Sequence, residues 1–417
     1  MALIRALNSG VSGLRSFQTK MDVIGNNIAN VETAGFKSSR ASFAELMSQS
    51  IGRTDSGGES SPQMNNQVGL GVRISSIDRD FSQGVMQNTG RGTDLAIEGK
   101  GFFMVQDNTQ SFMTRAGNFV FNKHGDLVDQ GGRNVQGYNA DQNGNVQGGG
   151  RTENIRVDFE NVSPPRQTEE VVISGNLAGE EGQVRTVSTS IYDSQGNAHS
   201  LLIEFTKEDG AANEWSYEVR FPDGGELPGG VNPTGTVTFD SDGNLVSNSE
   251  IEILDFNPDN GASTYSFDIK LGDAEQGSSF TQYAGSNTAK VLSQDGHTEG
   301  QLLDVEIDGE GRLQGIYDNG QNQTLAQLAI AQVQNENGLE MVGAGLFRAT
   351  SAAGEQFVTS AQDMAETSIN AGALEGSNVD LAKEFTEMIT SQRAYQSSAR
   401  VISTADEMLM EAVNLKR

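Results

Sequence analysis

Apolar side chains recur at every seventh position near the C-terminal end of the sequence. A seven-residue spacing is close to two helical turns, so such a row lies along one side of an α-helix. No Pro or Gly interrupts residues 378–417, and Ser377-Asn378-Val379-Asp380 is typical of a capped helix start. The pattern predicts a helix over residues 378–417, roughly 55 to 60 Å long at about 1.5 Å per residue. One row contains Leu381, Met388, Tyr395, Ile402 and Leu409, and its neighbour contains Phe385, Ala399 and Val413, with Gln392 and Asp406 in its other two places.

The same spacing occurs at the N-terminal end and predicts a helix over residues 2–30. Gly10, Gly13 and Gly25 each cost about 1 kcal/mol relative to Ala in a helix interior, so we expect this helix to form only where a partner covers its apolar rows. The same glycines would let a neighbouring helix approach closely. The rows contain Leu7, Leu14, Met21 and Ile28, and beside them Leu3, Gly10, Phe17, Ile24 and Val31.

The two terminal helices could each pack on a domain of their own, or they could pair with one another. Matching apolar rows at opposite ends of a glycine-rich chain favour pairing, and they predict a coiled-coil-like stem of residues 1–30 and 378–417. We expect the contacts of this stem, and any that it makes with another chain, to come from the apolar positions Leu3, Leu7, Leu14, Phe17, Met21, Ile24, Ile28, Leu381, Phe385, Met388, Tyr395, Ile402, Leu409 and Val413.

Between the helices the pattern changes to short apolar runs bounded by glycine and turn residues, which is typical of β-strands. One β-rich region spans residues 68–148, and residues 287–357 contain further strands. Another region, residues 149–286, begins at a run of glycines and has turn signals at short spacing that indicate a sandwich or barrel. The expected fold class is therefore α+β and mainly β. Residues 31–67, rich in Ser, Gly, Gln and Asn from residue 41 onward, and residues 358–377 are predicted to be linkers.

Composition and charge narrow the possible partners. The chain of 417 residues contains no Cys, which excludes disulfides, thiolate zinc sites and cysteine catalysis. Its formal net charge of −28 lies almost entirely between the terminal segments, because residues 1–40 carry +3 and residues 378–417 carry −1. Such an acidic surface repels nucleic acid and anionic membranes, so we expect neither as a partner. No run is long enough to insert into a membrane, and the N-terminal residues do not have the pattern of a cleaved signal peptide.

No motif in the sequence indicates an enzyme, and we expect no catalytic residues, no cofactor and no metal site. The histidines, His124, His199 and His297, are far apart and lie in or beside turns. Asp240-x-Asp242-Gly243 could begin a calcium loop, but Ile251 stands where an EF-hand needs Glu, so a hairpin turn is expected there. Folding could still bring two carboxylates together, as in a glycosidase, so spacing along the sequence leaves that class of enzyme as an alternative.

Two longer motifs resemble the bacterial flagellar rod and hook proteins. Met21–Val31, followed by Thr33 and Gly35-Phe36-Lys37, is similar to their N-terminal signature, and Ser9–Leu14 fits it as well. Glu375–Leu381 and the later Gln392-Arg393-Ala394-Tyr395-Gln396 are similar to their C-terminal motif. The signature positions are Asn26, Asn27, Asn30, Gly35, Phe36, Lys37, Ser377, Asn378, Val379, Asp380, Gln392 and Arg393.

This resemblance implies a structural subunit that assembles with copies of itself into a helical tube. It also implies that residues 68–148 and 287–357 form one β-domain into which residues 149–286 are inserted. The partners implied are the distal rod, the hook cap, the hook–filament junction proteins and the flagellar export apparatus, with the chain exported to the basal body or hook. Rod subunits are shorter, so the insertion favours the hook branch of the family over a distal rod protein. A secreted acidic adhesin or glycan-acting enzyme is the alternative from another class.

Overall fold

The chain folds into two compact units. The structure is a computed structural model, and it describes residues 2–50, 67–108, 110–141, 144–146, 150–160, 162–178, 183–207, 213–223, 233–247, 249–272, 279–364 and 366–414. The first unit, called here the terminal unit, comprises Met1–Asp158, Val305–Gln314 and Gln323–Arg417. The second, called here the inserted unit, comprises Phe159–Asp304 and Gly315–Asn322. The four-part division made from the sequence has different boundaries and stays a prediction.

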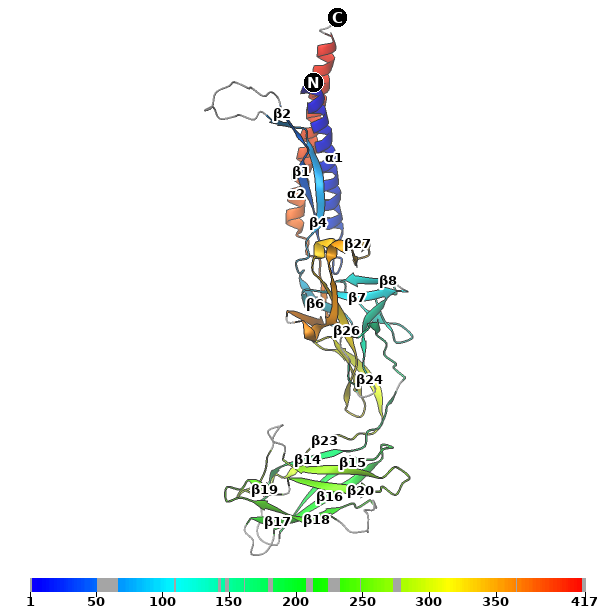
Figure 1. Ribbon diagram of the computed structural model, residues 1–417, viewed down its shortest axis with the longest axis vertical. Helices are drawn as coiled ribbons and strands as arrows, with labels where there is room; N and C mark the ends of the chain where they lie inside the picture. Colours follow the sequence, from blue (N-terminus) through cyan, green and yellow to red (C-terminus); the bar gives the residue numbers. More distant parts are fainter. Residues whose placement is uncertain are drawn as a thin grey trace. The chain divides into compact units, whose positions relative to one another are not determined.

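Two helices lie side by side in the terminal unit (Figure 1). They are α1, Ala2–Ala29, and α2, Leu381–Asn414, and they coincide closely with the helices predicted from apolar spacing. The helices are antiparallel, because Gly10 lies against Ile402 whereas Lys20, further along α1, forms an ion pair with Glu387, which is earlier in α2. Neither helix, over its described residues, has an apolar stretch long enough to cross a membrane.

Glycine allows the close approach of α2 at particular positions of α1. A Cβ atom added at Gly10 would lie 2.9 Å from Cγ1 of Ile402, and one at Gly13 would lie 3.1 Å from Oγ of Ser398. Both distances are shorter than an ordinary van der Waals contact, so a side chain at Gly10 or Gly13 would require Ile402 or Ser398 of α2 to shift. Gly25 is different, because a Cβ there would meet no atom within 4 Å. The expectation of close helix approach therefore holds for Gly10 and Gly13 and is wrong for Gly25 within one chain.

An antiparallel ribbon runs beside the helices (Figure 1). It consists of β1, Ser39–Glu45, and β4, Val72–Arg79. Phe43 of β1 stacks on Phe17 of α1 with ring centroids 5.7 Å apart, and the Val72 N–H donates to Oγ of Ser12 at 3.2 Å. The ribbon continues into β2, Ser48–Ser50, paired with β3, Gln67–Gly69.

The reading of residues 31–67 as a linker therefore missed β1. Its Ser- and Ala-rich sequence buries little apolar surface, and only pairing with β4 and contact with α1 make it a strand. Residues 51–66 of that predicted linker lie outside the described residues. The predicted linker 358–377 also contains strands, because β29 (Gln356–Ser360), β30 (Thr367–Ala371) and β31 (Ala373–Glu375) pair with the β-rich part of the terminal unit.

That β-rich part is built around an antiparallel sheet with the strand order β26-β11-β7-β8-β28-β27. Phe102, Phe347 and Val333 belong to a core on this sheet, and all are buried. The strands of the terminal unit not yet given are β5 (Met86–Asn88), β6 (Leu95–Gly99), β7 (Phe102–Asp107), β8 (Gln110–Thr114), β9 (Val120–Phe121), β10 (Leu127–Val128), β11 (Asn134–Asn139), β12 (Glu153–Asn154), β27 (Leu339–Gly343) and β28 (Leu346–Ala349). Strands β24 (Gly300–Ile307), β25 (Arg312–Tyr317) and β26 (Asn322–Val333) each have residues in both units.

The inserted unit has two sheets around one core, as a sandwich requires. One sheet has the order β20-β21-β14-β22, with β23 paired to β14, and the other has the order β15-β16-β17-β18-β19. Trp215, Ile173 and Phe267 come from both sheets and belong to the same buried cluster. The strands are β13 (Val162–Ser163), β14 (Glu170–Asn176), β15 (Val184–Tyr192), β16 (Ala198–Lys207), β17 (Glu214–Arg220), β18 (Thr234–Phe239), β19 (Leu245–Ser247), β20 (Glu250–Phe256), β21 (Tyr265–Leu271), β22 (Phe280–Thr281) and β23 (Lys290–Gln294).

Asp240 lies in a hairpin turn, as expected from the sequence. Its Oδ1 accepts the N–H of Asp242 at 2.9 Å and of Asn244 at 2.7 Å, and Gly243 supplies the positive φ of +83° between β18 and β19. Among the described residues, no three His, Asp or Glu side chains gather closely enough to hold a metal ion.

The first prediction concerns the helix contact. We expect Gly10→Val to lower the free energy of unfolding by about 1–3 kcal/mol, because overpacking forces side chains and backbone apart. Hydrogen exchange of α1 and α2 in the monomer, followed by mass spectrometry, should show faster exchange in both helices. The matched control is Gly25→Ala, which fills open space and should leave exchange unchanged or slow it, since Ala favours a helix by about 1 kcal/mol. Equal behaviour of the two variants would contradict the contact.

The second prediction concerns a buried tyrosine in the inserted unit. Burial and the nearby Asp193 raise the pKa of Tyr265, and its hydroxyl has no hydrogen-bond partner among the described residues. Above the usual tyrosine pKa of 10.0, the unfolded chain loses the Tyr265 proton while the folded chain keeps it. The free energy of unfolding therefore falls as pH rises above that value, and it is unaffected by this group at lower pH. Above that pH, Tyr265→Phe should therefore be more stable than the parent chain. At neutral pH it should be at least as stable as the parent chain. Denaturation followed by Trp215 fluorescence measures this, with the exposed Tyr283→Phe as the control.

Candidate assembly surface and the junction that holds it

The predicted stem positions on α1 are largely covered within the chain. Ile24 is 3% exposed, and it is the most deeply buried of them. The half-buried positions are Leu7, Leu14, Phe17, Met21 and Ile28. Leu3 lies in α1, but its side chain is outside the described residues. The apolar rows of α1 therefore face α2 and the ribbon more than they face solvent.

The predicted positions on α2 divide into half-buried ones and exposed ones, and the division does not follow the two rows. Met388, Tyr395, Ile402 and Leu409 are half-buried. In contrast, Leu381, Phe385 and Val413 are 39%, 50% and 67% exposed. Further apolar side chains that the heptad reading did not select are also exposed, namely Ile389 at 51%, Met408 at 60% and Met410 at 63%. Five of these residues fall on one side of the helix at 3.6 residues per turn, and we call them the exposed α2 surface: Leu381, Phe385, Ile389, Met410 and Val413. Met408 falls on another side, as does Val401, which is 44% exposed.

A polar contact fixes the end of the helix pair nearest the β-strands. Asn27 of α1 is 1% exposed, and its Nδ2 donates to Oε1 of Glu384 in α2 at 3.1 Å and to the Ser39 carbonyl at 2.8 Å. Its Oδ1 accepts the Ser39 N–H at 2.9 Å. Burial raises the pKa of Glu384. Asn27 thus connects α1, α2 and the start of β1 through one side chain.

The segment after α1 meets the segment before α2 at a buried ion pair. Nζ of Lys37 lies 2.7 Å from Oε1 of Glu375, and the two side chains are only 1% and 0% exposed. Lys37 also donates to the Ser82 carbonyl at 2.8 Å, and the Gly84 N–H donates to Glu375 at 2.9 Å. Gly35 adds a backbone bond to the Glu375 carbonyl at 2.7 Å. The chain ends are therefore joined by both charge and backbone.

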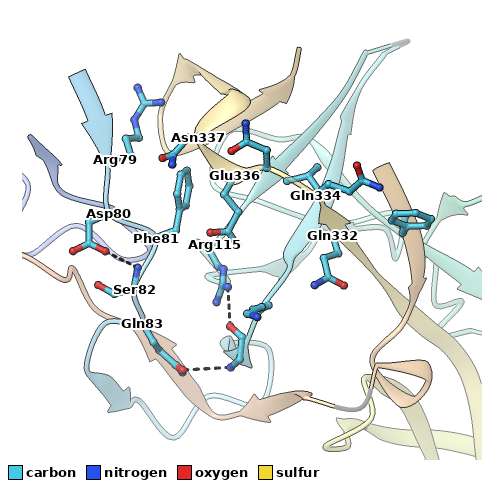
Figure 2. Close-up of a pocket in the computed structure, with 15 residues that line it drawn as sticks. Arg79, Asp80, Phe81, Ser82, Gln83, Arg115, Gln332, Gln334, Glu336 and Asn337 are labelled. Atoms are coloured by element: carbon cyan, nitrogen blue, oxygen red, sulfur yellow. Dashed lines mark hydrogen bonds between the residues drawn. The ribbon is translucent and has the colours of Figure 1, made fainter. Parts of the chain in front are cut away.

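Arg115 brings the β-rich part of the terminal unit into the same cluster. Its Nη1 is 3.3 Å from Oε2 of Glu375, and its Nη2 donates to the Gly99 carbonyl at 2.8 Å (Figure 2). Burial lowers the pKa values of Lys37 and Arg115, and the charge of Glu375 partly opposes both changes. One carboxylate thus serves two buried cations that come from distant parts of the sequence. We call Lys37, Arg115 and Glu375 the junction cluster.

Asn378 closes the junction on its other side. Its Oδ1 accepts the Ser38 N–H at 2.8 Å, and its Nδ2 donates to the Asp80 carbonyl at 2.7 Å. Asp380 then caps α2, because its Oδ1 accepts the N–H of Ala382 at 2.9 Å. Gly35 has φ of +69°, and a Cβ there would lie 2.5 Å from the Ala116 nitrogen, so only glycine fits this turn.

The structure gathers part of the sequence signature and leaves the rest apart. Asn27, Gly35, Phe36, Lys37 and Asn378 meet at the junction, with Phe36 6% exposed. Asn26 and Asn30 bond to one another near the end of α1, and the Ser377 Oγ accepts the Val379 N–H before α2. Gln392 and Arg393 are exposed on α2 and take no part in the junction.

Two members of the junction cluster were not chosen from the sequence. Glu375 falls within the C-terminal motif, whereas none of the motifs described above contains Arg115. Each charge stands alone in its stretch of sequence, in Ala373-Leu374-Glu375-Gly376 and in Met113-Thr114-Arg115-Ala116. A lone charge among mostly small or apolar residues is the one sequence feature that could have indicated a buried, paired side chain. Nothing in the sequence pairs the two charges, because they lie 260 residues apart.

Matches to known families cover most of the chain. Residues 7–37 match the family described as flagella basal body rod protein, and residues 370–415 match the C-terminal region of flagellar basal body rod proteins FlgEFG. Residues 96–184 match the D1 domain of flagellar hook proteins FlgE/F/G, and residues 176–297 match the D2 domain of flagellar basal body protein FlaE.

Similar proteins extend over the whole chain. The flagellar hook protein FlgE of Treponema pallidum is 34% identical, covering 100% of both chains. Those of Borreliella burgdorferi and Salmonella typhimurium are 34% and 33% identical over 99% of this chain and 100% of their own. The crystal structure of Helicobacter pylori flagellar hook protein FlgE2 superposes with a TM-score of 0.51 and 14% identity, covering 69% of this chain and 100% of that one. At that identity the likeness shows the fold alone.

The third prediction tests the junction cluster. Glu375→Gln leaves the Lys37 and Arg115 cations buried without their carboxylate, so we expect a loss of about 3–5 kcal/mol in the free energy of unfolding of the terminal unit. Glu340→Gln is the control, because the Glu340–Arg348 pair is more than half exposed and should contribute at most about 1 kcal/mol. Hydrogen exchange measures the terminal unit and Trp215 fluorescence the inserted one. A Glu375 variant as stable as the control would refute the role of the cluster.

Proposed function

This chain belongs to the flagellar hook protein FlgE family and is a structural subunit of the hook, and we propose that it assembles with copies of itself into a curved helical tube through its terminal helices. The observation that carries this proposal is the exposed α2 surface. Its apolar residues lie on a helix that already has one partner, α1, so their burial requires another chain.

The proposed driving force is burial of this surface between neighbouring subunits. Apolar area removed from water contributes about 25 cal/mol per Å². Several exposed apolar side chains on one helix are unusual for a chain that remains a monomer. We propose that α1 and α2 form the coiled-coil-like stem of each subunit, and that repeated heterologous contacts between stems generate an open helical assembly, since such contacts do not close on themselves.

The acidic β-domains would make weaker contacts than the stems. Like charges on neighbouring copies repel, and this repulsion limits tight association outside the apolar wall. Contacts of this kind could exchange while a bent tube rotates. We therefore propose a universal joint, in which the stems hold the tube together and the β-domains permit bending as torque passes from the motor and rod to the filament.

The wider assembly is proposed from family membership. The partners would be the distal rod, the hook cap, the hook–filament junction proteins and the export apparatus, with the subunit exported without a cleaved signal peptide to an extracellular position in the hook. The distal rod protein is the nearest alternative, but the relatives aligned over the whole chain carry the hook name. No observation favours an adhesin or a glycan-acting enzyme.

The test is electron microscopy of the purified chain, concentrated in a kosmotropic salt that strengthens apolar burial. Curved tubes support the proposal, and straight rods would favour a rod-type assembly. Short sheared fragments of tubes obtained under one condition should be added as seeds to samples that stay dispersed under another, which separates slow nucleation from an inability to assemble. Failure of the full chain to extend such seeds, or to form tubes at any salt concentration, would contradict self-assembly.

The fourth prediction identifies the surface. Phe385→Asp places a charge where the proposed interface is apolar, so we expect the concentration needed for assembly to rise at least tenfold, which corresponds to about 1.4 kcal/mol. Phe385 is 50% exposed, and the monomer should therefore unfold at nearly the same temperature as the parent chain. Thr386→Asp adds the same charge one position further along α2, on a different face, and serves as the control. Sedimentation of assembled material, checked by microscopy, gives the comparison.

A further inference from the structure

A cleft in the terminal unit lies beside the junction cluster. It has a volume of about 870 Å³ and is bordered by the end of β4, the turn between β6 and β7, the end of β26 and Phe357 of β29. Ligand sites in proteins commonly have volumes of about 300–1,000 Å³. Figure 2 shows Arg79, Arg115 and Glu336 among the side chains around it.

Nearly every cation at this cleft already has a carboxylate. Arg115 has Glu375, and Nζ of Lys100 is 4.0 Å from a carboxylate oxygen of Glu366. Arg79 differs from them. Among the described residues it forms no ion pair, and its buried Nε has no hydrogen-bond acceptor. Its recorded contacts are a long bond of 3.4 Å from Nη1 to the Leu339 carbonyl and the face of the Phe347 ring at 5.7 Å.

The acidic groups of the cleft are engaged elsewhere. Oδ1 of Asp80 accepts the Ser82 N–H at 2.9 Å, and hydrogen bonds from Ser82 lower the pKa of Asp80. Figure 2 shows the Asp80 carboxylate turned away from Arg79, and it shows the Glu336 side chain pointing toward Arg115. Arg79 is thus a half-buried guanidinium whose desolvation lowers its pKa and whose charge no carboxylate of the described part of the chain balances.

We infer that Arg79 binds an Asp or Glu carboxylate of a second copy of this chain, with the cleft receiving the acidic segment that carries it. This inference rests on the proposed self-assembly. Charge complementarity favours that occupant, because the chain has 56 acidic residues against 28 basic ones and each copy therefore offers many unpaired carboxylates. Guanidinium groups suit this contact, since Nε and Nη2 can donate side by side to both oxygens of a carboxylate.

The position of Arg79 fits an interface between copies. It is the last residue of β4, which lies against α1, and it also borders a second, smaller pocket together with Lys20 of α1 and Glu387 of α2. A carboxylate bound there would connect the β-domain of one copy to its neighbour next to the stem contacts. It would also compensate a buried charge that is unfavourable in the isolated chain.

Arg79→Met tests the inference because it should act in opposite directions on the monomer and on the assembly. Removing an uncompensated charge should leave the unfolding temperature of the monomer unchanged or raise it. The loss of a charged hydrogen bond should raise the concentration needed for assembly about ten- to a hundredfold. If Arg79 served only its own chain, through Leu339 and Phe347, the variant would lower the unfolding temperature and leave assembly unaffected at temperatures where it is folded. Either of these results overturns the inference.

The control variant is Arg348→Met. Arg348 is 51% exposed and pairs with Glu340 in its own chain, so its loss should change assembly less than about threefold. A second variant, Glu336→Gln, removes an acidic group from the cleft and should lower the concentration needed for assembly. An increase in that concentration would contradict the binding of a carboxylate.

Cross-linking identifies the occupant directly. The chain has no Cys, so Gln334→Cys, at an exposed position on the cleft, gives a single attachment point for a maleimide–benzophenone probe. Tubes grown from mixed ¹⁴N- and ¹⁵N-labelled chains should give cross-links between copies to a peptide that contains Asp or Glu. Cross-links confined to single copies overturn the inference.

The failures of the two proposals are distinguishable. If the parent chain forms no tubes under any condition, self-assembly itself has failed. If the parent forms tubes, Phe385→Asp prevents them, and Arg79→Met assembles as readily as Arg348→Met, then only the cleft inference has failed.

Discussion

A single buried carboxylate holds the two ends of this chain together. Glu375 accepts Lys37 from the segment after α1 and Arg115 from the β-rich part of the terminal unit, and its own backbone pairs with Gly35. Burying three charges is favourable only when each is paired and hydrogen-bonded, which restricts the backbone to a narrow set of positions. The helix pair can therefore keep a fixed attachment to its β-domain, although nearly the whole chain separates α1 from α2.

This attachment fixes the helix pair to the β-rich part of the terminal unit at one end, yet it leaves apolar side chains of α2 exposed. Asn27, Asn378 and the ribbon of β1 and β4 fix the end of the pair near the β-strands, and Gly10 and Gly13 set how closely the helices approach. The exposed α2 surface remains uncovered after all these contacts are made. In the assembly proposed above, a neighbouring chain covers this apolar area.

The inserted unit is held together by contacts of its own. Its core, centred on Trp215, is enclosed by its own two sheets, and its hairpins end in turns where an Asp side chain accepts neighbouring backbone N–H groups. It can thus be stable without the junction cluster. In the proposed assembly the terminal helices therefore hold the subunits together, and the inserted unit contributes surface and charge.

Local patterns in the sequence were enough to predict the terminal helices, the β-rich regions and the family. Heptad spacing is a local property of a helix, so the bounds of α1 and α2 could be predicted within a few residues, and the long terminal motifs identified the flagellar resemblance. Short-range patterns did not reveal β1, because its Ser- and Ala-rich sequence becomes a strand only beside β4 and α1. They also could not show that Phe385 is exposed whereas Ile402 is half-buried, since both belong to apolar rows of one helix. Which charges meet depends on the folded chain, because the attraction of Glu375 for Lys37 and Arg115 acts through space between residues that lie hundreds of positions apart.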